Sequence, residues 1–205
     1  MKISRLIAGS LLLLFAALAH AGAQKEEALS SSVQTAMQRS INDALQPKLM
    51  FANEAEGQAW LEAMSARIAK RVPDAFMRKR LLTAIHYEAT RAGLDPQLVL
   101  GLIYVESGFN RYAVSSVGAR GLMQVMPFWV RQIGHSRHNL FDVHTNLRFG
   151  CTILRHYLDI ENGDLFRALG RYNGSLGRAE YPNAVHAAWK KFFAWDGQGK
   201  SLPLR

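Results

Sequence analysis

Cysteine and the common metal-binding patterns are nearly absent from this sequence of 205 residues. Cys151 is its single cysteine, so no internal disulfide can form. The seven histidines occur in no HExxH pattern, and no CxxC pair is present. The apolar neighbours of Cys151 predict a buried, unreactive thiol. We therefore expect no disulfide scaffold, no metal site, no thiol chemistry and no cofactor.

Strand patterns are also missing, because alternation of apolar and polar residues never persists for more than a few positions and no internal repeat is visible. Helical signals are frequent instead. Asp74 and Asp95 are predicted N-caps, Pro96 is a favourable first helical residue, and Gly93 and Gly108 are predicted helix ends. The fold class is therefore expected to be mainly α. Helices are predicted within residues 25–46, 53–72, 74–93, 95–108, 122–134, 145–161, 164–173 and 183–195, with a loop from Phe109 to Gly121.

The chain has one long apolar run, and it lies at the N-terminus. Two cations precede an apolar stretch from Leu6 to Leu18, and small residues follow it, which predicts a signal peptide over residues 1–21 with cleavage after Ala21 or Ala23. The stretch is shorter than the roughly 20 residues that a membrane-spanning helix needs. No cysteine lies near the cleavage sites, as a lipoprotein would require. We expect an exported, periplasmic protein.

Acidic residues are scarce relative to basic ones. The 25 lysines and arginines outnumber the 16 acidic residues, so the formal net charge is +9, and removal of Lys2 and Arg5 with the signal peptide leaves +7. A basic protein favours polyanions, and an exported one meets acidic lipid and the cell wall before nucleic acid, which we do not expect as a partner. The densest basic cluster, residues 67–80, is interpreted either as a docking patch for a cell-envelope complex or as a solvated helix face.

One acidic residue stands at the end of an apolar helix. If residues 96–107 are helical, Glu106 shares its face with apolar residues three, four, seven and eight positions earlier. Desolvation there should raise the pKa of its carboxyl group and keep a proton available for general acid catalysis. The alternative is a solvated helix end, or a carboxylate paired with Arg111 or Arg120.

The residues after Glu106 resemble the signature of the soluble lytic transglycosylase family, and the likeness extends over about residues 81–195. Arg111 and Arg171 depart from the residues common in that family, but neither replaces a group that the chemistry requires. The matching residues are Glu106-Ser107, Phe109, Asn110, Ala113, Ser115, Gly118-Ala119-Arg120-Gly121, Leu122-Met123-Gln124, Pro127, Asn146, Gly150 and Tyr172-Asn173.

The resemblance implies a lysozyme-like multi-helix domain over residues 73–205, preceded by an N-terminal helical segment over residues 22–72. It implies a monomeric enzyme that cleaves peptidoglycan glycan strands. Glu106 would protonate the oxygen between N-acetylmuramic acid and N-acetylglucosamine, and would then act as base on the muramoyl C6 hydroxyl to close a 1,6-anhydro ring. The substrate-binding residues implied in this way are Ser107, Ser115, Gln124, Met126, Tyr172 and Asn173.

A second catalytic carboxylate, which most glycosidases use, is not evident. The chain has no acidic residue from Ser107 to Phe141, which favours a mechanism with one carboxylate. Two alternatives stay open: a goose-type lysozyme-like hydrolase, and a non-catalytic cell-wall-binding or secretion-associated protein. The later acidic residues that we interpret as helix caps or surface groups are Asp142, Asp159, Glu161, Asp164 and Glu180.

Overall fold

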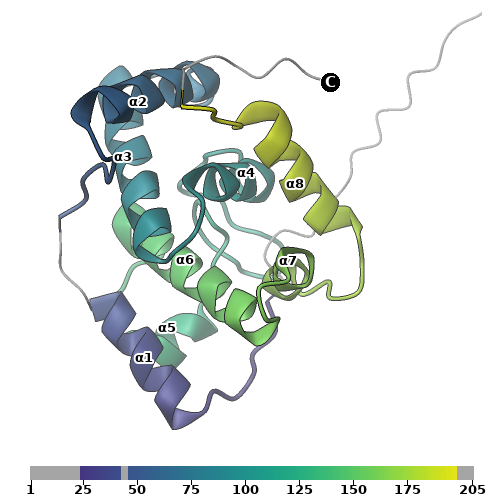
Figure 1. The fold of residues 1–205 in the computed structure, drawn as a ribbon. Coiled ribbons are helices and arrows are strands. Elements are labelled where there is room, and N and C mark those ends of the chain that lie inside the picture. The colour runs from purple at the N-terminus through teal and green to yellow at the C-terminus, as the bar shows by residue number, and fades with distance from the viewer. Residues whose placement is uncertain (1–23, 43–45, 198–205) are drawn as a thin grey trace, which may run out of the picture.

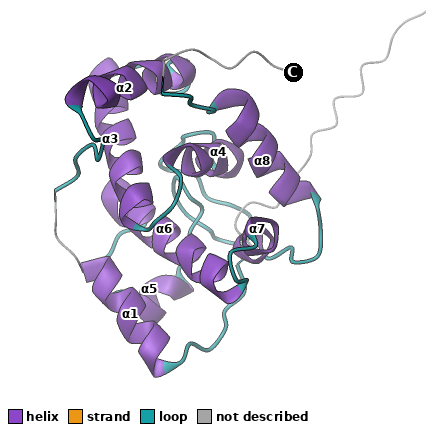
Figure 2. Cartoon of the chain, in the orientation of Figure 1, coloured by secondary structure: helices purple, strands orange, loops and turns teal. Residues whose placement is uncertain are grey.

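The computed structural model describes residues 24–42 and 46–197, and the predicted signal peptide lies outside them. This part of the chain is mainly helical, as expected, and contains no strand beyond the isolated bridges of Val114 with Arg120 and of Arg120 with Val125. The helices pack around a central one, α4 (Figures 1 and 2). Their bounds are α1 Ser31–Asn42, α2 Glu54–Ile68, α3 Ala75–Arg91, α4 Pro96–Glu106, α5 Phe128–Ile133, α6 Val143–Ile160, α7 Leu165–Asn173 and α8 Glu180–Phe192.

The helix boundaries follow the capping residues. The Asp74 side chain accepts a hydrogen bond from the backbone N–H of Met77, and Asp95 accepts from the N–H groups of Gln97 and Leu98. Both predicted N-caps are therefore confirmed. Because an aspartate oxygen satisfies an N–H that lacks a helical partner, these residues determine where α3 and α4 begin. None of the described helices is both long enough and apolar enough to cross a membrane.

The first predicted helix is wrong at its start. We expected helix from residue 25, but α1 begins at Ser31. The preceding residues make contacts with other elements instead: the backbone carbonyl of Glu27 accepts a hydrogen bond from the Gln132 side chain, 3.0 Å away. Three consecutive serines also compete with helix formation, and the Ser30 hydroxyl accepts from the N–H of Val33 in the manner of an N-cap.

Helix α4 is buried on several sides because its residues are almost all apolar. On the side that faces α8 the contact depends on Gly101, where a Cβ atom would lie 2.8 Å from the backbone nitrogen of Trp189. The missing side chain therefore lets α8 cross α4 closely, and Figure 1 shows the two helices side by side. Helix α3 packs on α4 and α6, and α7 packs on α6 and α8. The C-terminal end of α4, where Glu106 lies, is held from several directions.

The predicted N-terminal helical segment packs on the rest of the chain. Trp60 and Met64 of α2 are fully buried against α3, and Met37 and Ile41 of α1 are buried near α6. These side chains belong to the same hydrophobic core as the residues of α4. The described residues before 73, which are 24–42 and 46–72, are therefore part of one packed body with the helices that follow them.

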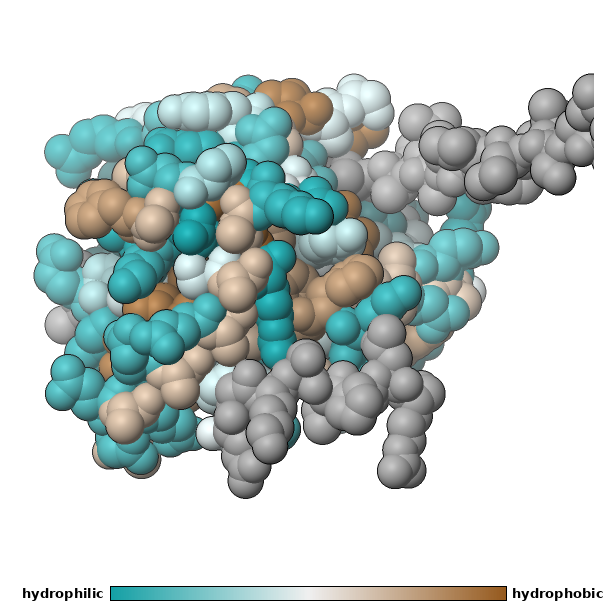
Figure 3. Space-filling view, turned by 90° about the horizontal axis from the view of Figure 1, so that it is seen from above, coloured by the Kyte–Doolittle hydropathy of each residue, from teal (hydrophilic) through white to brown (hydrophobic). Residues whose placement is uncertain are grey.

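The basic cluster at residues 67–80 is only partly free for a partner. Arg67 donates to the backbone carbonyl of Ala194, and Arg78 donates to the Ser65 hydroxyl and to the carbonyl of Val72. The Arg71 guanidinium lies 4.3 Å from the centre of the Tyr104 ring. Lys70, Lys79 and Arg80 are exposed, and the Arg80 guanidinium lies 5.6 Å from the centre of the exposed Phe76 ring. Figure 3 looks down on the molecule from above the view of Figure 1 and shows hydrophilic groups interspersed with apolar ones on that face.

Candidate active site

Glu106 is the last residue of α4, and only 6% of its surface is exposed. One carboxyl oxygen, Oε1, accepts a hydrogen bond from the Tyr181 hydroxyl at 2.5 Å. The other, Oε2, is buried and has no hydrogen-bond partner. Burial raises the pKa of Glu106 to about 8, although the bond from Tyr181 acts to lower it. The carboxyl group is therefore largely protonated at neutral pH, as a general acid requires.

The alternative partners of Glu106 are engaged elsewhere. Arg111 donates to the backbone carbonyl of Phe141 and covers the Tyr112 ring, and the Arg120 guanidinium lies 5.8 Å from the centre of the Phe141 ring. Within the described part of the chain no ion pair involves Glu106. Glu106 is therefore better described as a neutral acid among apolar neighbours than as a paired or solvated carboxylate.

The loop after α4 is held by side chains that donate to its backbone. The Ser107 hydroxyl donates to the carbonyl of Leu122 at 2.7 Å. Asn146 of α6 accepts from the N–H of Met123 and donates to the carbonyls of Arg120 and Leu140, all at 2.8 Å. Because these backbone groups have no regular ladder to pair with, such bonds are what keeps the loop in one conformation.

Gly121 is required at the tightest point of this loop. Its φ is +77°, and a Cβ atom would lie 2.5 Å from the carbonyl oxygen of Leu140 and 2.4 Å from Nδ2 of Asn146. Any side chain would therefore displace Asn146 from the bonds that it makes to the loop. This is a packing reason for the glycine, whatever its relation to substrate.

Two of the predicted substrate-binding residues are buried and already bonded within the protein. Gln124 is 1% exposed, and its side-chain nitrogen donates to the carbonyls of Ala113 and Gly121. Tyr172 is fully buried, and its hydroxyl donates to the carbonyl of Met123 at 2.7 Å. In this structure both side chains hold the loop, as Ser107 does, and direct contact of either with a sugar stays a prediction.

The other predicted substrate-binding residues lie in the loop between α4 and α5 and at the end of α7. The Ser115 hydroxyl accepts from the N–H of Ala119 and so closes a turn in the loop. Met126 is partly exposed just after the buried Gln124, and Asn173 is buried at the end of α7 beside Tyr172. Their roles toward substrate also stay predictions.

Sequence reasoning missed Tyr181. This residue lies in the first turn of α8, is 7% exposed and donates its hydroxyl hydrogen to Glu106. Burial and the nearby Glu106 raise the pKa of Tyr181 well above its usual range, so the hydroxyl stays a donor. Its sequence context, "AEYPNAV", carries no catalytic pattern. The signal that could have found it is a buried tyrosine at a helix start, which needs a polar partner.

The later acidic residues make contacts that do not involve Glu106. Asp142 and Asp164 cap α6 and α7, Asp159 pairs with Arg155, and Glu161 bonds to the side chains of Arg167 and Arg171. Glu180 is exposed in the first turn of α8. The interpretation as helix caps or surface groups is confirmed for Asp142, Asp159, Asp164 and Glu180, whereas Glu161 is buried between two arginine side chains.

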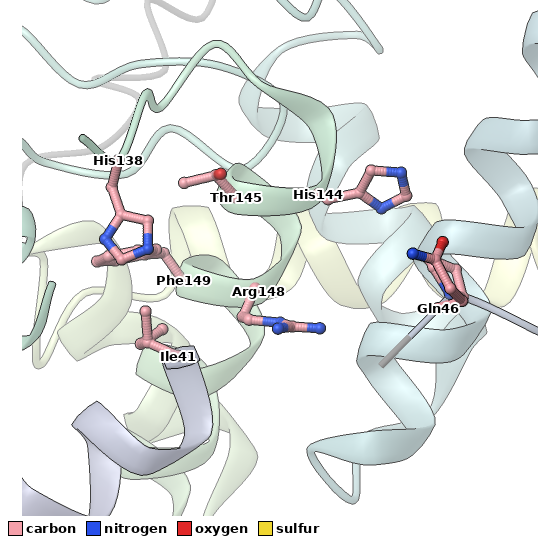
Figure 4. A pocket seen from close by; sticks show the side chains of 8 residues that line it. Ile41, Gln46, His138, His144, Thr145, Arg148 and Phe149 are labelled. Carbon is pink, nitrogen blue, oxygen red and sulfur yellow. The ribbon is translucent and has the colours of Figure 1, made fainter. Parts of the chain in front are cut away.

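The histidines form no metal cluster within residues 24–42 and 46–197. His138 and His144 border a cavity of about 270 Å³ at the start of α6, with Arg148 between them (Figure 4). His138 accepts from the backbone N–H of His135, and the two rings stack with their centres 3.7 Å apart. Glu106 does not line this cavity, which is therefore separate from the candidate active site.

Comparison with known families agrees with this arrangement. The model of the family "Transglycosylase SLT domain" matches residues 83–191. The chain belongs to this family. The matched residues include Glu106, Tyr181 and the whole loop between α4 and α5, whereas α1, α2 and the start of α3 lie outside the SLT match.

Relatives with similar sequences carry related names. A "Transglycosylase" of Enterobacteria phage PRD1 is 40% identical over 88 residues, which cover 43% of this chain and 32% of the relative. A "Membrane-bound lytic murein transglycosylase C" of Haemophilus influenzae is 35% identical over 115 residues, or 48% of this chain and 32% of the relative. This SLT protein thus matches about a third of the length of these relatives.

Proposed function

We propose that this protein is a lytic transglycosylase that cleaves peptidoglycan between N-acetylmuramic acid and N-acetylglucosamine without consuming water. The observation that carries the proposal is a buried, neutral Glu106 at the centre of an SLT domain. The names of the relatives support the substrate class.

Glu106 would act first as an acid. Because Tyr181 donates to Oε1, the proton of the neutral carboxyl group is assigned to Oε2, which has no partner in the protein. That proton would pass to the glycosidic oxygen as the bond to C1 of the muramoyl residue breaks. The acetamide of the same sugar would stabilise the positive charge at C1, which is the role that a second carboxylate has in most glycosidases.

Glu106 would act next as a base. After the first step it is a carboxylate, and the Tyr181 hydroxyl then stabilises its charge through a charge-assisted hydrogen bond. The carboxylate would take the proton of the muramoyl C6 hydroxyl while the C6 oxygen bonds to C1. This closes the 1,6-anhydro ring, returns Glu106 to its neutral form and needs no water. The attacking oxygen is already part of the sugar, so proximity assists the step.

We further propose that the protein acts in the periplasm and that peptidoglycan strands are its main partner. The signal-like residues 1–21 and the net positive charge support this location and this polyanionic substrate. The exposed Lys70, Lys79 and Arg80 are the cations of the 67–80 cluster that remain for docking on a cell-envelope complex. Deletion of all three charges should weaken capture of such a complex and leave the reaction intact.

Mass spectrometry of a peptidoglycan digest tests the proposed reaction. We expect muropeptides with anhydro ends, each one water lighter than the hydrolytic product, and no such product from Glu106→Gln, which keeps the shape of the side chain but removes its proton. The rate should fall at least about a thousandfold, while Asp159→Asn, a change at an exposed pair with Arg155, should digest normally.

Each other result contradicts the proposal in its own way. Reducing muramoyl ends would indicate a goose-type lysozyme-like hydrolase with the same acid. Binding to peptidoglycan without any Glu106-dependent product would indicate a non-catalytic wall-binding protein.

A further inference from the structure

The backbone from Gln124 to Met126 has two edges, and only one of them is paired within the loop. The N–H and carbonyl of Val125 exchange hydrogen bonds with Arg120, both at 3.0 Å. The carbonyl of Gln124 and the N–H of Met126 belong to the opposite edge, since neighbouring residues of an extended segment direct these groups to alternate sides. An unpaired edge of this kind needs another partner.

The Gln24 side chain pairs with that second edge. Its Nε2 donates to the carbonyl of Gln124 at 3.0 Å, and its Oε1 accepts from the N–H of Met126 at 3.0 Å. One side-chain amide thus makes the two bonds that a neighbouring strand would make. Gln24 is 4% exposed although it lies about 100 positions earlier in the chain. It also lies outside residues 83–191, to which the SLT match is confined.

We propose that Gln24 is a positioning residue that fixes the Gln124–Met126 segment of the active site in its catalytic conformation. The inference rests on the proposed function, because it concerns the rate of the same reaction. Gln24 acts through the loop and makes no contact with Glu106 among the hydrogen bonds of the structure.

This segment needs external support because its conformation is unfavourable by itself. Gln124 has φ +49°, in the left-handed region that residues other than glycine rarely adopt. Just before it, the carbonyl of Leu122 accepts a hydrogen bond from Ser107, which follows Glu106 in the chain. The carbonyl of Met123 accepts from Tyr172, whose pKa is raised by burial and by the nearby Glu106. A shift of Gln124 would therefore be transmitted toward the catalytic carboxyl group.

The segment that carries Gln24 is itself anchored. The carbonyl of Glu27 accepts from Gln132, and the carboxylate of Glu27 lies 3.5 Å from the Arg171 guanidinium. Gln34 of α1 donates to the backbone carbonyl of Gln132 at 2.7 Å. Both predicted cleavage sites precede Gln24, so an exported chain would keep it. The Gln24 amide is thus held at the loop by a segment that is fixed to α5 at Gln132 and to α7 at Arg171.

The first test is Gln24→Ala in the full chain, assayed on purified peptidoglycan. We expect kcat to fall about tenfold with a smaller change in KM, because a misplaced loop weakens transition-state positioning. Gln58→Ala is the control: it removes an exposed side-chain hydrogen bond to Glu62 within α2 and involves neither the loop nor the segment that carries Gln24, so its kcat should be unchanged. Equal losses of kcat in both variants would overturn the proposal, because they would indicate general loosening.

Hydrogen exchange gives a readout that does not depend on activity. In Gln24→Ala the amide of Met126 should exchange faster, while the amide of Val125, which pairs with Arg120, keeps most of its protection. If the Met126 amide exchanges at the wild-type rate, Gln24 does not stabilise the Gln124–Met126 segment. If exchange changes as expected but no variant or wild-type protein forms product, the proposed function fails and the structural contact stands.

Gln24→Glu provides a reversible version of the test. An ionised carboxylate can accept from Met126 but cannot donate to the carbonyl of Gln124, so kcat should be low at neutral pH. Once protonated, the side chain has both a donor and an acceptor and should restore the pair. Because burial disfavours the charged form, recovery should begin above the ordinary glutamate pKa of about 4.3. The ratio of variant to wild-type kcat should therefore rise as pH falls, and a ratio that does not change with pH would contradict the role of Gln24.

Discussion

Glu88 and Glu106 are the two most deeply buried glutamates in the described part of the chain, and their surroundings differ in one respect. Glu88 of α3 is fully buried between two guanidinium groups: Nη2 of Arg148 lies 2.8 Å from one carboxylate oxygen, and Nε of Arg91 lies 2.9 Å from the other. Glu106 of α4 is almost as deeply buried, but within the described part of the chain its side chain accepts a hydrogen bond only from a neutral tyrosine hydroxyl. The first site compensates a negative charge and the second does not.

This difference separates a structural carboxylate from a reactive one. Glu88 connects α3 to α6 through Arg148, and Arg91 in turn donates to Ser40 of α1, so the charged cluster joins three helices. A reactive acid needs the opposite environment, in which ionisation is disfavoured until a substrate accepts the proton. Burial alone therefore does not point to a catalytic group, whereas burial without a nearby cation supports the role proposed for Glu106.

Glu88→Gln should break the structural site and give the largest effect on stability. The change keeps the shape of the side chain but leaves two half-buried arginines without a counter-charge, so we expect the protein to lose about 3 kcal/mol of unfolding free energy. Urea unfolding at neutral pH measures this loss. The exposed Glu62→Gln on α2 is the control and should change little. A Glu88→Gln variant as stable as the wild type would mean that the cluster contributes no net stability.

Glu106→Gln should change the unfolding free energy in the opposite direction to Glu88→Gln, and by a smaller amount. The folded protein raises the pKa of Glu106 from its ordinary 4.5 to about 8, so ionisation opposes folding. The penalty is absent below pH 4.5, where the group is neutral in both states, and it grows as pH rises until it is complete above about 8. The full difference between these pKa values would correspond to about 5 kcal/mol at high pH, and relaxation of the buried site around the charge reduces it, so we expect the variant to be more stable than the wild type by about 2 kcal/mol there.

The measurement is the difference in urea midpoint between Glu106→Gln and the wild type from pH 4 upward. The difference should be near zero at the acidic end and should increase toward pH 8. A difference that is already present at pH 4 would reflect altered packing. A wild type that gains stability over the same range relative to the variant would show that Glu106 ionises readily, and both the general-acid assignment and the contrast with Glu88 would then be wrong.

The sequence was sufficient for the parts of the fold that depend on local signals. Asp74 and Asp95 could be recognised as N-caps because capping requires only a short polar side chain before a helix. The environment of Glu106 was predictable for a similar reason, since the helical period of α4 places apolar residues on its face. The family resemblance, carried by short motifs around the loop, is confirmed by the SLT match.

The remaining parts depend on contacts between distant residues. Tyr181 reaches Glu106 only because α8 crosses α4 at Gly101, and Gln24 reaches the loop only because residues 24–30 are not helical. No local pattern encodes either contact. The role of Tyr172 could not be predicted for the same reason. Its hydroxyl donates to the carbonyl of Met123, a contact that sequence spacing could not reveal.

Tyr181→Phe should have the smallest effect of these substitutions, and it tests what the single hydrogen bond to Glu106 contributes. It removes the one hydrogen bond that lowers the pKa of Glu106, so that pKa should rise further above 8 and the alkaline limb of the rate profile should move to higher pH. We expect kcat to fall about tenfold, because the carboxylate formed after proton donation loses its donor. Tyr87→Phe is the control, since Tyr87 is equally buried but its hydroxyl has no hydrogen-bond partner. An alkaline limb that moves to lower pH in Tyr181→Phe would show that the hydroxyl stabilises the neutral acid, and Tyr181 would then assist the first proton transfer and not the second.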